Sequence, residues 1–150
     1  MAHAHIEDRI ILSGCLIISD NKKILLLYRS DHNHYETPGG KVRISECDNP
    51  KEPTINDLEK TAKRELYEEL GKDIEIEKFD YFGKVKFTIP GGKLAIANKF
   101  LVKLTGNPKV NEPDKFSKFD YLTIEDLENN PISPDLKLLI PKLKEYVKAN

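Results

Sequence analysis

The sequence predicts a single α/β domain in which a mixed β-sheet lies between helices. Strand-like apolar runs stand on both sides of one strongly patterned helix, and a second amphipathic helix closes the chain. Elements in this order bury their apolar faces well when helices cover both sides of a sheet. The 150 residues suffice for one domain with a sizeable core.

Composition narrows the classes of ligand and partner. Lys and Arg number 24 and Asp and Glu number 25, so the net charge is −1 and duplex nucleic acid is not an expected partner. A small charged ligand suits this balance better. The longest apolar runs are too short for a membrane span and no hydrophobic signal segment is seen, so a cytoplasmic location is expected. The two cysteines, Cys15 and Cys47, are then expected as free thiols.

The first elements are two strands, expected at 9–19 and 23–29. Both runs are rich in leucine or β-branched residues, and the turn-forming stretch DNKK separates them. Residues 1–8 are expected to form a flexible terminus, and the terminal histidines His3 and His5 are assigned no function.

A glycine segment and a polar excursion follow. The glycines of PGGK at 38–41 permit backbone angles closed to other residues and let the main chain approach a ligand. The stretch CDNPKEP at 47–53 holds two prolines and is interpreted as a surface loop that stops before a helix.

The central helix is expected over about 55–70. Thr54 can cap it, with Asp57 three residues on as the second half of a capping box. Gly71 offers a C-terminal stop. Its buried stripe recurs every four residues, at Leu58, Ala62, Leu66 and Leu70.

In the C-terminal half, the sequence pattern predicts a hairpin, a short strand and two helices. Strands are expected at about 74–88 and from 94 onward, then a strand in FDYL, a short helix in TIEDLE and a final helix at about 134–147. Asn98 falls on the apolar face of the second hairpin strand. It is either a satisfied polar group of the core or a hydrogen-bonding contact in a ligand cleft.

Three glutamates share one edge of the central helix. At 100° per residue, Glu68 and Glu69 lie on either side of Glu65, beside the apolar stripe. Carboxylates gathered in this way suit a hard cation such as Mg²⁺, which prefers oxygen ligands and bridges to phosphates. The alternative is a solvated acidic face supported by the pair of Arg64 with Glu68.

PGGKV followed by RELYEELG resembles the Nudix hydrolase signature, G-x5-E-x7-R-E-U-x-E-E-x-G-U, where U is aliphatic. The matching residues are Gly40, Arg64, Glu65, Leu66, Glu68, Glu69 and Gly71, whereas Lys72 takes the last aliphatic place. The resemblance implies a Nudix-type α/β/α fold over residues 1–150.

The two halves of the signature lie farther apart in this sequence than in the family pattern, so the position of the first signature glutamate is ambiguous. Counting forward from Gly40 places that glutamate at Glu46, and counting back from Arg64 places it at Asn56. A ten-residue insertion, within the loop 46–54, accounts for the excess. Both positions stay open at this point.

Beyond the signature, nearly the whole chain looks like the MutT-type branch of the family. There a glutamate in the loop after the long strand reaches the metal site, and Glu112 in KVNEP is the best match. A residue at the start of the last helix reads the base edge, and Asp135 matches that place with a carboxylate instead of an amide.

The resemblance implies Mg²⁺-dependent hydrolysis of a nucleoside diphosphate-linked substrate, with Mn²⁺ as an alternative ion. The implied ligands are Glu65, Glu68, Glu69, Glu112 and the Gly39 carbonyl. Glu65 or Glu112 is the general base, and Arg64 orients a glutamate. Substrate contacts are expected from Arg29, Lys41, Gly40, Asn98 and Asp135.

A purine nucleoside triphosphate, oxidised or not, is the expected substrate. ADP-ribose or a nucleotide sugar is the alternative, and a non-catalytic nucleotide-binding module is the alternative of another class. The protein is expected to be a monomer or a homodimer.

Overall fold

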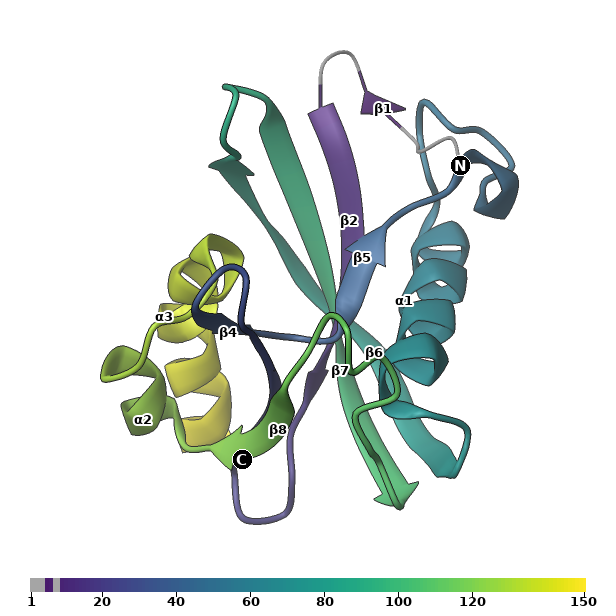
Figure 1. The fold of residues 1–150 in the computed structure, drawn as a ribbon. Coiled ribbons are helices and arrows are strands. Elements are labelled where there is room, and N and C mark those ends of the chain that lie inside the picture. Colours follow the sequence, from purple (N-terminus) through teal and green to yellow (C-terminus); the bar gives the residue numbers. More distant parts are fainter. Residues whose placement is uncertain (1–4, 7–8) are drawn as a thin grey trace.

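The computed structural model describes residues 5–6 and 9–150, which form two β-sheets with helices on both sides (Figure 1). In chain order the elements are β1 (His5–Ile6), β2 (Arg9–Ile17), β3 (Ile24–Arg29), β4 (His34–Glu36), β5 (Gly39–Lys41), a 3₁₀ turn (Ile44–Glu46), α1 (Ile55–Leu70), β6 (Ile74–Thr88), β7 (Leu94–Gly106), β8 (Lys118–Leu122), α2 (Ile124–Glu128) and α3 (Pro134–Ala149). The predicted arrangement of a mixed sheet between helices is confirmed.

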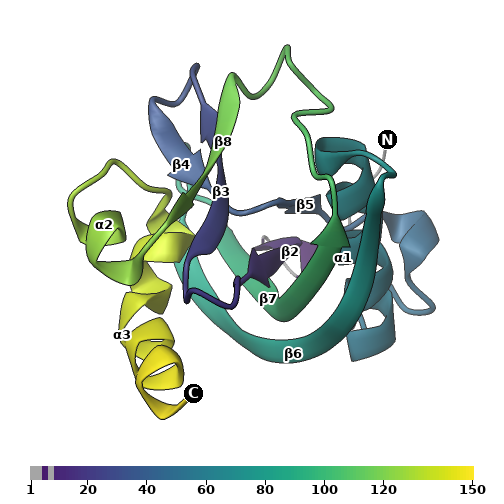
Figure 2. The ribbon, with the colours of Figure 1, turned by 90° about the horizontal axis from the view of Figure 1, so that it is seen from below.

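The larger sheet has the strand order β1-β2-β7-β6, and β5 pairs with β2. The β2–β7 pair is parallel, with Arg9 opposite Leu94 and Ile17 opposite Val102, whereas the other pairs are antiparallel. Because β5 pairs with Leu12, Ser13 and Gly14 on the side of β2 opposite to β7, it places the glycine segment at the edge of the sheet, beside the middle of β2. Figure 2 shows β5 between α1 and the smaller sheet.

The smaller sheet has the order β4-β3-β8. The first two long strands are joined by a turn, as expected from the sequence, but β2 and β3 belong to different sheets. A single bridge between Ile18 and Ile24 links them. The chain therefore leaves the larger sheet after β2, forms β3 and β4 in the smaller sheet, and returns to the larger sheet at β5.

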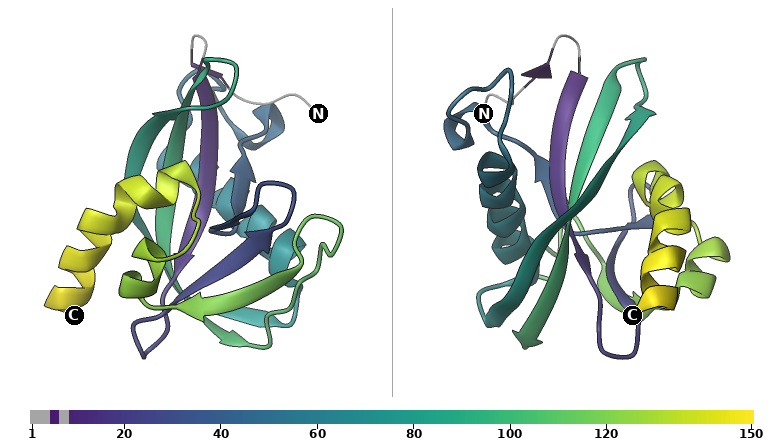
Figure 3. Two further views of the ribbon diagram at one scale, coloured as in Figure 1. Left: turned by 60° about the vertical axis from the view of Figure 1, so that its left-hand side comes forward. Right: turned by 180° about the vertical axis from the view of Figure 1, so that it is seen from behind.

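The central helix α1 forms over the residues that the sequence predicts. The Thr54 side chain accepts from the Asp57 amide at 3.2 Å, and the Asp57 carboxylate accepts from the Thr54 amide at 3.0 Å. Its apolar stripe packs with β2, β3 and β7 in one core cluster. A second cluster lies under α2 and α3, on the opposite side in both views of Figure 3. Two separate cores thus fix the sheets from both sides.

Two further sequence expectations concern the terminus and the membrane. Residues 1–4 and 7–8 of the terminus expected to be flexible lie outside the described residues, whereas His5 and Ile6 pair with β2. None of the helices in the described part of the chain combines the length and apolar content needed to cross a bilayer.

Replacing residues 48–52 by two glycines should leave the fold intact. Most of this segment is exposed, and its hydrogen bonds at Asn49 are local. The entropy of loop closure also changes slowly with length. We expect the melting temperature to stay within a few degrees, whereas Thr54→Ala, which removes the α1 cap, should cost about 1 kcal/mol. Loss of soluble folded protein on shortening would show that the segment is structural.

Candidate metal and catalytic site

The glutamates of α1 differ in depth. Glu69 is fully buried and Glu65 is 9% exposed, whereas the Glu68 side chain is 39% exposed. The sequence predicts all three at the rim of the core. Glu65 and Glu69, four residues apart, instead extend into the protein, and Glu68 alone stays at the rim. The buried pair is therefore the centre of the candidate site.

The glycine strand β5 lies directly against these carboxylates. The Gly39 amide donates to both oxygens of Glu69, at 3.4 and 3.3 Å. A Cβ atom at Gly40 would collide with the Glu65 carboxylate. Neither glycine has a left-handed φ, so unusual backbone angles do not explain them. Close packing does, because only glycine leaves room for the Glu65 carboxylate at position 40, and a Cβ atom at Gly39 would collide with the backbone of Ser13 and Gly14 in β2.

Arg64 connects α1 to the 3₁₀ turn. Its Nε and Nη2 donate to the two Glu46 oxygens at 2.7 and 3.1 Å, and its Nη1 donates to Glu65 Oε1 at 2.8 Å. Glu46 also accepts from the Thr61 hydroxyl at 2.9 Å. Asn56, the other candidate for the first signature glutamate, is exposed. Glu46 is therefore the residue that supports Arg64.

Charge pairing fixes this network in its ionised form. Burial alone would raise the pKa of Glu46, but hydrogen bonds from Arg64 and from the Arg43 amide bring this pKa below its usual value. Burial alone would lower the pKa of Arg64, yet its bonds to Glu46 and the charge of Glu65 raise it. Arg64 thus holds Glu65 by a charge-assisted hydrogen bond.

Glu69 is in a different electrostatic environment. Burial raises its pKa well above the usual value, and the neighbouring Glu65 adds to the rise, while Lys115 opposes it. The Lys115 ammonium lies 3.9 Å from Glu69 Oε1. A buried carboxylate beside a second one is stabilised in its charged form by a cation between them.

The loop between β7 and β8 attaches to the C-terminal end of α1. The Asn111 amide donates to the Glu69 carbonyl and its side chain donates to the Glu68 carbonyl, both at 2.9 Å. Lys109 donates to the Leu70 carbonyl at 3.0 Å. These bonds satisfy carbonyls that a helix end leaves free. Glu112 is the next residue along this loop after Asn111.

Glu112 carries an oxygen that suggests a missing ligand. Its Oε1 is buried and has no hydrogen-bond partner. A buried carboxylate oxygen without a partner is unfavourable, and a metal ion or its bound water would satisfy it. Glu65 and Glu69 offer further carboxylate oxygens on α1, and oxygen donors of this kind fit Mg²⁺ or Mn²⁺.

The family comparison agrees with this geometry. The model of the NUDIX domain matches residues 10–143. The chain belongs to the Nudix family. It is a Nudix pyrophosphohydrolase, a class of enzyme that cleaves phosphoric anhydrides and generally uses divalent metal ions. A search of curated proteins gives no match.

Solved structures place the chain in the MutT-like part of the family. A MutT Nudix hydrolase from Burkholderia pseudomallei is 25% identical, with a TM-score of 0.71, over 89% of this chain and 96% of that one. A MutT protein from Methanosarcina mazei is 24% identical, with a TM-score of 0.70, over 93% and 96%. The Nudix domain of Shewanella oneidensis NrtR, complexed with ADP-ribose, shares the fold at 17% identity, with a TM-score of 0.70, over 93% and 88%.

Asn98 has its polar atoms satisfied within the Nudix sheet. Its Nδ2 donates to the Leu12 carbonyl at 3.1 Å and its Oδ1 accepts from the Tyr81 hydroxyl at 2.9 Å. Of the two roles that the sequence leaves open, these bonds favour the satisfied core group. Lys41 is exposed, and its carbonyl accepts from Arg64 at 3.3 Å. Its ammonium remains available to a ligand.

Asp135 lies in a buried ion pair that sequence reasoning missed. Its Oδ2 is 2.7 Å from Lys99 Nζ, and the same ammonium donates to the Thr37 hydroxyl at 2.6 Å. Lys99 is 5% exposed and Asp135 is 9% exposed. Burial alone would raise the pKa of Asp135, but the Lys99 charge holds it below its usual value. The first turn of α3 is thus tied to β7 and to the segment that leads into the glycine strand.

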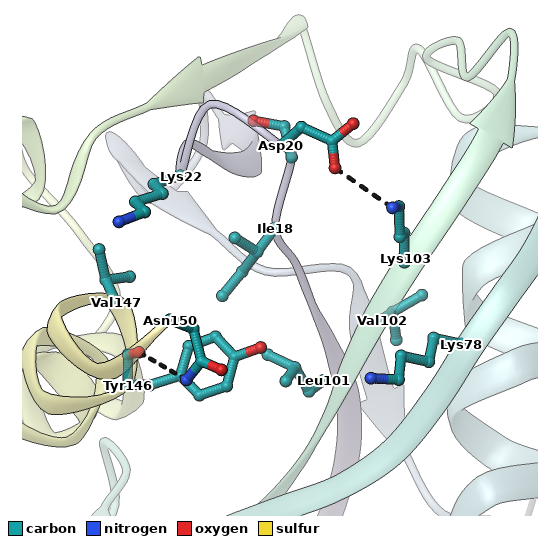
Figure 4. Close-up of a pocket in the computed structure, with 11 residues that line it drawn as sticks. Ile18, Asp20, Lys22, Lys78, Leu101, Val102, Lys103, Tyr146, Val147 and Asn150 are labelled. Carbon is teal, nitrogen blue, oxygen red and sulfur yellow. Dashed lines mark hydrogen bonds and ion pairs between the residues drawn. The ribbon is translucent and has the colours of Figure 1, made fainter.

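A cavity of about 250 Å³ lies away from the glutamate edge of this Nudix domain, where the segment between β2 and β3 meets β6, β7 and the end of α3. Figure 4 shows Tyr146 of α3 and the C-terminal residue Asn150 at one side, and Lys78 and Lys103 at the other. Its lining includes no residue that the sequence assigns to the site. The cavity is therefore separate from the candidate metal centre.

Proposed function

We propose that this Nudix protein is a Mg²⁺-dependent enzyme that cleaves a purine nucleoside triphosphate, oxidised or not, to the monophosphate and pyrophosphate. The observation that carries this proposal is the burial of Glu65 and Glu69 on α1 against the glycine strand, with the unpartnered Glu112 oxygen in the loop that bonds to the end of that helix. When bound there, Mg²⁺ or Mn²⁺ would neutralise phosphate charge and lower the pKa of a bound water.

Residues of the chain are proposed as metal ligands, as the general base and as positioning groups. Glu65, Glu69, Glu112, Glu68 and the Gly39 carbonyl are the proposed ligands. Glu112 is favoured over Glu65 as general base, because Glu65 already accepts a hydrogen bond from Arg64, whereas Glu112 Oε1 has no partner. Arg64 positions Glu65, and Glu46 positions Arg64.

Arg29, Lys41 and the Gly40 backbone are proposed to contact the phosphates. Arg29 is directly opposite His34 in the β3–β4 pair, two residues from Leu27, which packs in the same core cluster as the stripe of α1. Residues two apart on a strand share a face. Arg29 therefore extends from β3 on the side of α1, where its guanidinium, which pairs with Asp31 and Glu36 in this structure, is proposed to donate a further hydrogen bond to a phosphate oxygen.

Asp135 is proposed to bind the base. An ionised carboxylate only accepts hydrogen bonds, and guanine offers N1–H and the 2-amino group as donors. Lys99 pairs with Oδ2 of Asp135 and keeps the carboxylate ionised, so Oδ1 is the oxygen proposed to accept from the base. Guanine-type triphosphates should accordingly be preferred over pyrimidine ones.

A second candidate substrate is ADP-ribose or a nucleotide sugar. The likeness to the NrtR Nudix domain, whose structure holds ADP-ribose, favours it. The third candidate, nucleotide binding without turnover, is disfavoured because the signature glutamates of α1 are all present. A cytoplasmic location and a monomeric or homodimeric state stay predictions from the sequence.

A release assay across nucleoside triphosphates, ADP-ribose and nucleotide sugars, with Mg²⁺, Mn²⁺ or EDTA, tests the proposal. We expect metal-dependent pyrophosphate release and a kcat/KM for guanine-type triphosphates about tenfold or more above that for pyrimidine ones, as one charged hydrogen bond would give. Asp135→Asn should reduce this ratio.

The other outcomes separate the candidates. An unchanged ratio in Asp135→Asn would leave Asp135 only its structural role beside Lys99. Turnover confined to ADP-ribose or nucleotide sugars would select the second candidate. Nucleotide binding without any metal-dependent release would select the third.

A further inference from the structure

The β3–β4 hairpin carries a group of side chains that the proposed hydrolysis does not use. His34 and Glu36 lie two residues apart on β4 and therefore project from the same face. His32 precedes them in the turn, and Asn33 has a left-handed φ of 52° that reverses the chain between the two histidines. The hairpin thus presents two imidazoles and one carboxylate together.

The donor atoms of this group lie at distances that suit one metal ion. One ligand atom from each of His32, His34 and Glu36 lies within 4.8 Å of the others. His34 Nε2 and Glu36 Oε2 are 3.0 Å apart. Two atoms bonded to Zn²⁺ at about 2.0–2.2 Å in tetrahedral geometry are roughly 3.4 Å apart, so a small adjustment opens the pair for an ion.

Neighbouring charges already orient the carboxylate. Arg29 Nη1 is 3.5 Å from Glu36 Oε1, which leaves Oε2 toward His34. A partner that holds one oxygen while the other faces the ion is the usual outer-shell arrangement of metal sites. The His32 side chain is 47% exposed, so it can rotate to complete the set.

We propose that His32, His34 and Glu36 form a binding site for a divalent transition metal of the Zn²⁺ class, separate from the glutamate edge of α1. The two sites differ in donor chemistry. Imidazole nitrogen suits Zn²⁺, Ni²⁺ and Cu²⁺, whereas the all-oxygen edge suits Mg²⁺. The inference does not depend on the proposed hydrolysis.

Calorimetric titration of Zn²⁺ into EDTA-treated, dialysed protein tests this site. The chain has four histidines, so the titration is made in a His3→Ala/His5→Ala background that removes the terminal pair. We expect one Zn²⁺ per chain and a rise in melting temperature on Zn²⁺ addition, because an ion that binds only the folded state stabilises it. His34→Ala should weaken Zn²⁺ binding by about tenfold or more, and His34→Gln, a milder change, should weaken it as well.

Two control variants distinguish the hairpin site from Zn²⁺ bound at the glutamate edge. Asn33→Gly keeps the three donors and suits the left-handed turn, so it should retain Zn²⁺ affinity. Glu65→Gln/Glu69→Gln should lose Mg²⁺ binding while the single Zn²⁺ stays. Absence of Zn²⁺ binding in the background protein, full affinity in His32→Ala/His34→Ala, or loss of the Zn²⁺ with the α1 glutamates would overturn the proposal.

Discussion

Glu69→Gln should lower kcat/KM by about 100-fold or more, because it removes a metal ligand worth several kcal/mol of charge stabilisation. The substitution keeps the shape of a fully buried side chain beside the Gly39 amide. It also removes a buried charge, so the protein should fold with an unchanged or higher melting temperature. Loss of activity without loss of stability separates a role at the metal from a role in packing.

Steady-state kinetics over a range of Mg²⁺ concentrations measures this effect. Glu59→Gln is the matched control on the same helix, since Glu59 is partly exposed and, among the described residues, pairs only with Lys63 at 3.0 Å. An exposed pair of this spacing contributes a few tenths of a kcal/mol. The control should therefore keep wild-type kinetics. Near wild-type turnover of Glu69→Gln at saturating Mg²⁺ would show that Glu69 is not a ligand.

The helix that carries the site could be predicted from local signals. Capping by Thr54 and the four-residue stripe depend on neighbours in the sequence, and α1 begins and ends where they indicate. The depth of each glutamate could not be predicted in this way. Glu69 is buried because β5 packs over it, and the position of β5 depends on its pairing with the distant residues Leu12, Ser13 and Gly14 of β2.

The spacing of the signature likewise did not decide which residue occupies its first glutamate position. Glu46 and Asn56 fit equally well when counted along the chain, and the choice rests on the hydrogen bonds from Arg64 to Glu46 across an insertion. The glycines at 39 and 40 were recognised, but for conformational freedom and approach to a ligand. Their close contacts, of Gly40 with the Glu65 carboxylate and of Gly39 with the backbone of Ser13 and Gly14, become visible only when the helix and the strands are placed together.

Lys99 was missed because it lies in a strand whose pattern gives no reason to expect a buried charge. Its neighbours Ala97 and Phe100 are buried, and lysine is rarely found inside without a partner. That partner, Asp135, lies far along the chain and was expected only as a contact to the base. A pairing between distant residues leaves no periodic signal in the sequence.

Lys99→Met should destabilise the protein by about 3–5 kcal/mol, the usual effect of leaving one charge of a buried pair without its partner. Asp135 would stay in a largely buried position, and Thr37 would lose its donor. The double variant Lys99→Met/Asp135→Leu removes both charges, so it should recover most of this loss. Lys144→Met is the matched control, because the Lys144–Glu128 pair is about half exposed and contributes at most about 1 kcal/mol.

Urea unfolding at several pH values measures all four proteins. The Lys99 charge lowers the folded-state pKa of Asp135 below its ordinary value of 3.8, so the contribution of Asp135 ionisation to stability is complete above that value and is lost as the pH falls through the folded-state pKa. The stability of the wild type should therefore fall faster than that of the double variant as the pH drops below about 4. If Lys99→Met cost no more than Lys144→Met, the ion pair would not hold α3 against β7. The purine preference would then be the remaining reason to keep a carboxylate at Asp135.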